Sequence, residues 1–231
     1  MAELQHRLGR LGFDCGRVDG IFGPRTAHAL QDFQANSGLP ADAVCGTETS
    51  RSIDRVIGQT GSGPGVGAVR EREQMRRGYG TLKDCRIALG QYGGMSALTR
   101  VIARELRHQG ASVMSLDEPD PVAQAHASNH FQAHVYLGLE AIVEPQVVAH
   151  FYQVPTFESV GGHQLAIALA ERLAYLEGLT SDARGMRLPI LRETRMPAVL
   201  LCIGPIKTAL SAAPMVNAAC IEALTLWVTS R

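Results

Sequence analysis

Apolar residues recur at helical spacing in three short segments near the N-terminus. Leu4, Leu8 and Leu11 lie three or four residues apart among Gln, His and Arg residues, and this spacing predicts an amphipathic helix. A second helix is predicted to begin at Pro24, because proline at the first helical position lacks only a donor that would be unpaired there. A third helix is predicted from Thr47. The first part of the chain therefore reads as a small three-helix bundle.

Two of these helices are entered through the same sequence pattern. Residues 18–26 read VDGIFGPRT and residues 41–49 read ADAVCGTET, so Asp, two apolar residues, Gly and Thr recur at the same spacing. Asp19 and Asp42 are expected to accept hydrogen bonds from backbone N–H groups in their turns, as Asp commonly does. The repeated pattern therefore predicts the same turn before the second and the third helix.

The pattern of the remaining chain changes from helices alone to strands that alternate with helices. A glycine-rich stretch, QTGSGPGVGA, begins at residue 59 and is typical of a flexible tether. We therefore expect a helical domain over 1–58, a linker over 59–82 and a second domain over 83–231. Short apolar runs predict strands at 85–89, 112–116, 135–139, 147–152 and 198–203, and helical periodicity predicts helices at 98–108, 121–131, 165–176 and 209–228. This alternation predicts an α/β domain with a mostly parallel central sheet.

Composition narrows the possible partners. The 231 residues carry a formal net charge of zero, so no overall basic field points to nucleic acid. No apolar run approaches the 18 or more residues that a membrane span requires. The N-terminus lacks the hydrophobic core of a signal peptide, and five cysteines, an odd number, favour free thiols over a disulfide framework. We expect a cytoplasmic protein.

The residues alone predict no catalytic set. His126, His130 and His134 are spaced four residues apart, and two of them could share a helix face as zinc ligands do. No carboxylate accompanies them, so a solvated helix face is the favoured interpretation. Cys202 lies in an apolar run and reads as a packed thiol. No phosphate-binding loop and no Gly-x-Ser-x-Gly motif occur.

The segment LQHRLGRLGF, the turn VDGIFGPRT and the following ALQDFQANSGLPADAVCG also resemble the peptidoglycan-binding module of bacterial cell-wall hydrolases. The resemblance covers roughly residues 2–57. It implies binding of peptidoglycan or a related glycopeptide beside the two turns, with Asp19 and Asp42 as candidate ligand-binding residues.

Residues 83–231 resemble the zinc-dependent N-acetylmuramoyl-L-alanine amidase domain. The resemblance rests on ALTRVIARELRHQG, GGHQLAIALAERLAYLEG and RGMRLPILRETRMPAVLLCIG. It implies that Tyr92 stands where active members have a zinc-binding His and that Met95 stands at the metal-binding Glu. Glu140 falls at the second metal-binding His, and Cys202 falls at the catalytic Glu.

All four of these implied positions have changed, and together they offer one good zinc ligand in place of three. Without the metal no bound water becomes acidic enough to attack an amide. We therefore expect no cofactor and a chain that is not an enzyme. This agrees with a resemblance to the CwlM-type pseudo-amidases of actinobacteria, which implies a regulator of cell-wall synthesis.

The partners that this resemblance implies are a peptidoglycan fragment or a cell-wall precursor enzyme. The candidate surfaces are the cleft around Tyr92, Glu140 and Cys202 and the module beside its two turns. Two alternatives remain open. One is an active zinc-dependent amidase with substituted ligands, and the other is an unrelated scaffold that has kept both folds.

Overall fold

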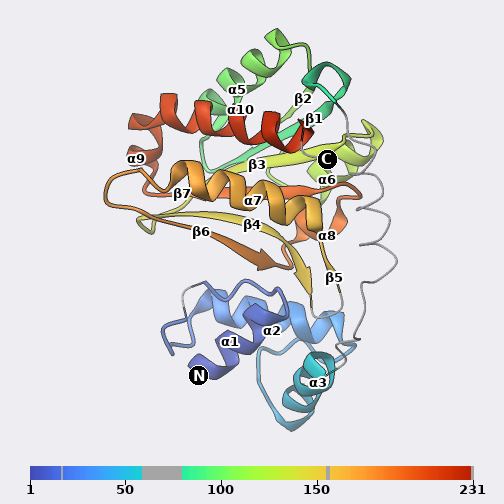
Figure 1. The fold of residues 1–231 in the computed structure, drawn as a ribbon. Coiled ribbons are helices and arrows are strands. Elements are labelled where there is room, and N and C mark those ends of the chain that lie inside the picture. The colour runs from blue at the N-terminus through green and yellow to red at the C-terminus, as the bar shows by residue number, and fades with distance from the viewer. Residues whose placement is uncertain (17, 59–79, 155–156, 230–231) are drawn as a thin grey trace.

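The computed structural model describes residues 1–16, 18–58, 80–154 and 157–229 (Figure 1). The predicted linker over 59–82 lies mostly outside these residues. A helical N-terminal part lies beside β4, β5 and β6 of a larger α/β part (Figure 1). We call the N-terminal part, residues 1–58, the module.

The module is the predicted three-helix bundle. Its helices are α1 (Ala2–Arg10), α2 (Pro24–Asn36) and α3 (Thr47–Gly58). Their apolar stripes meet in a core in which Leu8, Leu30 and Ile53 are fully buried. Burial of each such side chain contributes about 1.5–3 kcal/mol, so this core holds the three short helices together.

The first turn of the module is organised by a buried glutamine on α1. The Gln5 side-chain amide donates to Asp19 Oδ1 at 3.0 Å and contacts the Ile21 carbonyl at 3.0 Å and Thr26 Oγ1 at 3.1 Å. Its own oxygen accepts the Gly20 N–H at 2.8 Å. The Ile21 N–H donates to Asp19 at 2.8 Å, which confirms the predicted role of this aspartate.

The second turn repeats the same contacts with different residues. The Gln34 amide reaches Asp42 Oδ1 at 2.8 Å, the Val44 carbonyl at 3.0 Å and Thr49 Oγ1 at 3.3 Å. Its oxygen accepts the Ala43 N–H at 3.0 Å, and the Val44 N–H donates to Asp42 at 2.9 Å. Each turn is therefore fastened by a glutamine from the preceding helix.

The second part is built on a seven-stranded sheet with the order β2-β1-β3-β7-β4-β5, and β6 also pairs with β4. Strands β1, β2, β3 and β7 are mutually parallel, whereas β4 runs antiparallel to β7 and parallel to β6. The mostly parallel sheet that the alternating pattern predicts is confirmed. The strands are β1 (Arg86–Tyr92), β2 (Ser112–Leu116), β3 (Val135–Ala141), β4 (Gln146–Val154), β5 (Phe157–Glu158), β6 (Thr180–Met186) and β7 (Ala198–Ile203).

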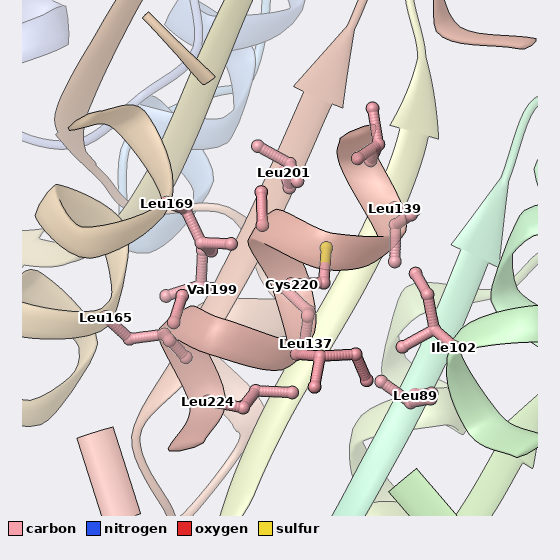
Figure 2. Packing of buried hydrophobic residues seen from close by; sticks show 14 of the residues in the cluster. Leu89, Ile102, Leu137, Leu139, Leu165, Leu169, Val199, Leu201, Cys220 and Leu224 are labelled. Carbon is pink, nitrogen blue, oxygen red and sulfur yellow. The ribbon is translucent and has the colours of Figure 1, made fainter. Parts of the chain in front are cut away.

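Helices cover both faces of this sheet. One face packs against α5, α7 and α10 through a large apolar cluster that includes Leu137, Val199 and Leu224 (Figure 2). The opposite face packs in part against α6 and α8, through Ala125, Ile190 and neighbouring side chains. The helical elements are η1 (Leu82–Asp84), α5 (Ser96–His108), α6 (Pro121–His130), α7 (Val160–Leu173), α8 (Pro189–Glu193), α9 (Ile206–Ser211) and α10 (Ala213–Thr229).

Several elements differ from the sequence prediction; β5, α8 and η1, for example, were not expected. Strand β1 continues to Tyr92, beyond the predicted end at residue 89. Strand β6 was not predicted, because its residues alternate between exposed and partly buried without an apolar stripe. The predicted helix 209–228 is divided into α9 and α10, and Pro214 stands in the first turn of α10, where proline favours a new helix start.

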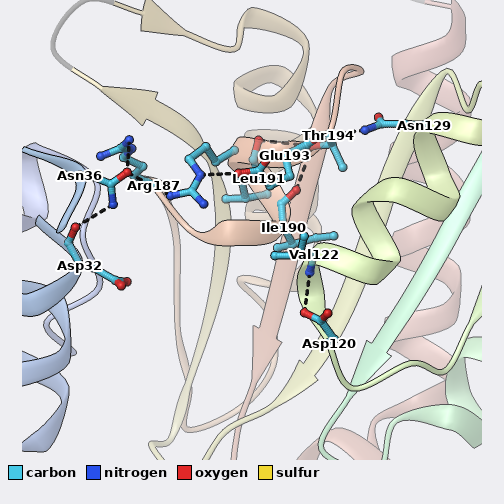
Figure 3. A network of polar contacts seen from close by, with 11 residues as sticks. Asp32, Asn36, Asp120, Val122, Asn129, Arg187, Ile190, Leu191, Glu193 and Thr194 are labelled. Atoms are coloured by element: carbon cyan, nitrogen blue, oxygen red, sulfur yellow. Dashed lines mark hydrogen bonds and ion pairs between the residues drawn. The ribbon is translucent and has the colours of Figure 1, made fainter. Parts of the chain in front are cut away.

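The module is fastened to the second part around Arg187, which follows β6. The Arg187 backbone N–H donates to the Gly12 carbonyl, and its guanidinium lies 5.0 Å from the centre of the Phe13 ring. The same side chain donates to Asn36 Oδ1 at 2.9 Å, which Arg192 also reaches at 3.3 Å (Figure 3). Gly12 has a φ of +81°, and a Cβ atom there would lie 2.4 Å from the Arg187 nitrogen, so only glycine permits this approach.

Within the residues that the structure describes, no helix has the length and apolar character needed to cross a membrane.

Candidate functional site

Three of the four site positions implied by the amidase resemblance form one row across the sheet. Tyr92 on β1 pairs in register with Glu140 on β3, and Glu140 pairs with Cys202 on β7. Val148 on β4 continues the row beyond Cys202. Registered neighbours in a sheet point to the same face, so the three side chains stand together at the carboxyl ends of parallel strands.

Glu140 and Cys202 contact each other directly. The Cys202 thiol donates to Glu140 Oε2 at 3.4 Å. Burial raises the pKa of Glu140, and the thiol hydrogen bond only partly offsets this. Burial, followed by the charge of Glu140, raises the pKa of Cys202 well above its ordinary value. Cys202 is therefore held as a neutral thiol, which is a poor nucleophile.

The Tyr92 hydroxyl stands at the other end of the row. It is closed off from solvent and has no hydrogen bond of normal geometry in the described part of the chain. Burial raises its pKa, although the nearby Tyr136 hydroxyl favours the ionised form. Tyr136 is itself fixed by its hydroxyl, which donates to Gln124 Oε1 at 2.9 Å. The row therefore ends in a buried hydroxyl group at Tyr92.

Met95, the fourth position, does not join this row. Its side chain is fully buried in the apolar cluster between the sheet and α5. Its backbone N–H donates to Gln91 Oε1 at 2.9 Å at the start of that helix. Because the side chain points into the core, Met95 acts as packing at the helix entry.

The row opens into a cleft of about 1340 Å³ between the sheet and the module. Glu140, Cys202, Val148 and Leu200 line it from the sheet, and Gln5, Phe13 and other module residues line it from the opposite side. This volume exceeds that of most pockets for small ligands. The cleft therefore has room for a ligand built of several sugar or amino-acid residues.

His150 on β4 is a cleft residue that the sequence analysis did not identify. It pairs in register with Leu200 and Arg184 and lines the cleft. Its Nδ1 is buried and has no hydrogen-bond partner among the residues described. Burial lowers its pKa from 6.5 to about 4, so the ring is neutral at pH 7. The sequence did contain a signal for this residue, because His150 is a polar side chain within the apolar run at 147–152.

The module contributes an ion pair to the same cleft. Arg25 Nη2 lies 3.5 Å from Asp14 Oδ2, and Arg25 Nη1 lies 3.6 Å from Glu144 Oε1 on the β3–β4 turn. All three residues line the cleft. The charge of Asp14 raises the pKa values of Glu140 and His150, and the charge of Arg25 lowers them. The module therefore contributes to the electrostatic potential at the strand edge.

Asp19 and Asp42, the candidate ligand-binding residues of the module, are used within their own turns. Each carboxylate binds the glutamine and the backbone N–H described above, and the Val44 N–H is the largest cause of a lowered pKa at Asp42. Neither aspartate lines the cleft. Their contacts account for the repeat as a folding device, and a role in ligand binding stays a prediction.

The donor set does not fit a zinc ion. Within the described ranges, no three His, Cys, Asp or Glu side chains come together as a metal site would require. His126 is exposed on α6, and His134 lies beyond that helix, where its ring accepts the Arg86 N–H at 3.2 Å. Glu140 and Cys202 supply two candidate ligands, fewer than the three protein ligands of a catalytic zinc site.

Comparison with known proteins identifies both parts. Residues 1–53 match a family of peptidoglycan binding domains. A Mycobacterium tuberculosis protein named N-acetylmuramoyl-L-alanine amidase CwlM is 30% identical over 236 residues, covering 88% of this chain and 58% of that protein. Over most of its own length the chain is therefore similar to a protein named as an amidase. It joins a peptidoglycan-binding domain to an amidase-like α/β domain and spans somewhat over half the length of this relative.

Further relatives agree with this division. A spore cortex-lytic enzyme of Bacillus cereus is 47% identical over 51 residues, which are 22% of this chain and 20% of the enzyme. An N-acetylmuramoyl-L-alanine amidase from Clostridium difficile 630 shares the fold, with a TM-score of 0.50 and 12% identity. It covers 64% of this chain and 98% of that structure. The amidase-like fold of the second domain is therefore shown.

These comparisons contradict the expectation that the chain is not an enzyme. A relative that matches most of this chain is named as an amidase, and one that matches the module is named as a cortex-lytic enzyme; both are names of enzymes. The expectation rested on four aligned positions alone. Other polar groups, such as His150 and Arg25, line the same cleft, and changes at those four positions do not remove them.

Proposed function

We propose that this chain acts on the bacterial cell wall by binding a muropeptide, a sugar with its attached peptide, in the cleft between its two domains. The observation that carries this proposal is the position of the cleft. One wall belongs to a domain that matches a peptidoglycan-binding family, and the other is the strand edge of an amidase-like sheet.

The shape and polarity of the cleft support this ligand class. A muropeptide presents hydroxyl groups, amides and carboxylates along an extended body. The cleft presents apolar side chains such as Phe13 and Leu200 together with charged groups such as Arg25 and Glu140. Ligand sites combine an apolar lining with a few placed polar groups in this manner.

A pair of nearby substitutions tests the location of the site. Gln146 lines the cleft, so Gln146→Trp should obstruct it and weaken muropeptide binding by about tenfold or more in isothermal titration calorimetry, equivalent to about 1.4 kcal/mol. Val143, on the turn just before β4, is 85% exposed and does not line the cleft, so Val143→Trp is the matched control. Equal affinities for wild type and Gln146→Trp would place the ligand elsewhere.

Hydrolysis of the bond between the sugar's lactyl group and the first amino acid is the second candidate function. The names of the matched relatives favour it. The described side chains offer fewer ligands than a catalytic zinc ion requires. Mass spectrometry of a muropeptide incubated with the protein, with and without added zinc, would show the free sugar and free peptide if the amide is cleaved. An intact substrate under both conditions argues against hydrolysis.

A cytoplasmic location and a cell-wall precursor enzyme as partner stay predictions of the resemblance. Cell fractionation and co-purification of the endogenous full-length protein would test both.

A further inference from the structure

Arg25 lines the cleft but is loosely paired. It stands in the first turn of α2, and its stem passes close to Gly16, where an added Cβ would lie 3.0 Å from Arg25 Cδ. Its two ion-pair contacts measure 3.5 and 3.6 Å, and neither is a hydrogen bond. The side chain is 54% exposed. The planar guanidinium therefore keeps donors that an incoming group can use.

The two acidic neighbours of Arg25 come from different domains. Asp14 belongs to the module, and its Oδ1 accepts the Gly16 N–H at 2.8 Å, which fixes the loop. Glu144 belongs to the β3–β4 turn of the amidase-like domain and is 45% exposed. An exposed pair such as Arg25–Glu144 contributes little stability, so a ligand can replace Glu144 at small cost.

We propose that Arg25 binds a carboxylate of the muropeptide's peptide stem, displacing Glu144, so that the module supplies a specificity-determining residue to the amidase-like cleft. A carboxylate matches the guanidinium fork through two parallel hydrogen bonds, which a lysine cannot reproduce. This inference rests on muropeptide binding in the cleft. It adds the group that is recognised and the domain that recognises it.

The position of Arg25 relative to the sheet supports the same assignment. The charge of Arg25 favours the ionised form of Glu140 and disfavours the protonated ring of His150, so the guanidinium acts electrostatically on the strand edge. The contacts around Arg187 and Asn36 hold the module in this position (Figure 3). Because Arg25 and the row of Tyr92, Glu140 and Cys202 line the same cleft, a ligand that fills the cleft can contact both.

The test compares two ligands and four variants by isothermal titration calorimetry. The ligands are an N-acetylmuramoyl-peptide with a free terminal carboxylate and the same compound with a terminal carboxamide. Wild type should bind the carboxylate about tenfold more tightly, the size expected of a charge-assisted pair. Arg25→Gln should abolish this preference and Arg25→Lys should retain part of it. Glu144→Gln should strengthen carboxylate binding about threefold, because it removes the competing anion.

Arg51→Gln, an exposed position on α3, is the matched control and should behave as wild type. Because Arg25 is largely exposed, its variants should fold, which thermal melting checks. Equal affinity of wild type for the two ligands, or a preference that survives in Arg25→Gln, overturns the role of Arg25 and leaves muropeptide binding intact. Absence of binding to either ligand by wild type overturns the proposed function and this inference with it.

Discussion

Glu140 and Cys202 occupy registered positions on β3 and β7, and the Cys202 thiol donates to the Glu140 carboxylate at 3.4 Å. A thiol is a weak donor, so this contact compensates only in part for the burial of a carboxylate. The burial of Glu140 therefore makes the free energy of unfolding depend on pH, and the direction follows from the shift in its pKa.

Glu140→Gln should stabilise the protein at neutral pH. Burial raises the pKa of Glu140 above its ordinary 4.5, so the folded state disfavours the ionised form. The stability that Glu140 contributes is therefore fully present below pH 4.5. It is lost as the pH rises from there through the pKa of Glu140 in the folded state. Urea unfolding of both proteins from pH 3.5 to 7.5 should show a gain for the variant that disappears at the acidic end. Glu177→Gln, at an exposed position, is the control, and an unchanged pH profile in Glu140→Gln would refute the argument.

His150→Phe should stabilise the protein by roughly 1–3 kcal/mol at pH 7, because it removes the buried Nδ1 atom, which has no hydrogen-bond partner among the described residues. Burial lowers the pKa of His150 from 6.5 to about 4. The free energy of folding therefore benefits fully from the neutral ring above pH 6.5 and loses this benefit as the pH falls towards 4. The variant should lack that loss. His126→Phe on the exposed face of α6 should leave the free energy of unfolding near its wild-type value. A destabilised His150→Phe would indicate that the ring is structural.

The two module turns predict a reciprocal pair of substitutions. Ala43 has a φ of +58° where Gly20 in the first turn has +78°, and alanine in this left-handed region is strained by about 1–2 kcal/mol. Ala43→Gly should therefore stabilise the module by roughly 0.5–1 kcal/mol after the greater flexibility of the unfolded chain is subtracted. Gly20→Ala should destabilise it by a similar amount. Thermal unfolding measures both, and shifts of the same sign would contradict the equivalence of the turns.

Arg187→Ala should loosen the module without unfolding either domain. The substitution removes the contact with the Phe13 ring and the hydrogen bond to Asn36, together worth about 1–3 kcal/mol. Small-angle X-ray scattering should show a larger radius of gyration, while circular dichroism stays unchanged. Arg100→Ala on the exposed side of α5 is the control. Scattering identical to wild type would show that Arg187 does not hold the domains together.

The sequence predicted the local elements better than the site. The regular spacing of leucines gave the module helices, and the repeated Asp positions gave the turn contacts that Asp19 and Asp42 make. Strand β6 escaped prediction because its polar sequence is held in the sheet by pairing with β4, which a local pattern does not contain.

The resemblance implied four positions, and the structure brings three of them together; the contribution of Arg25 was missed because it depends on how the module docks. Tyr92, Glu140 and Cys202 come together because each lies near the end of one of three adjacent strands. Arg25 belongs to a domain whose placement is set by contacts more than 150 residues apart in the chain, such as Asn36 with Arg187. No periodicity or motif encodes that placement.

The contact between the Gly12 carbonyl and the Arg187 amide uses main-chain atoms on both sides. This part of the joint tolerates divergence of the surrounding side chains other than Arg187, as long as glycine is kept at the close approach. A hybrid protein carrying a different cell-wall-binding bundle with glycine at this position should thus seat on the same sheet. Exchanging bundles would then alter what the cleft accepts while the strand edge stays as it is.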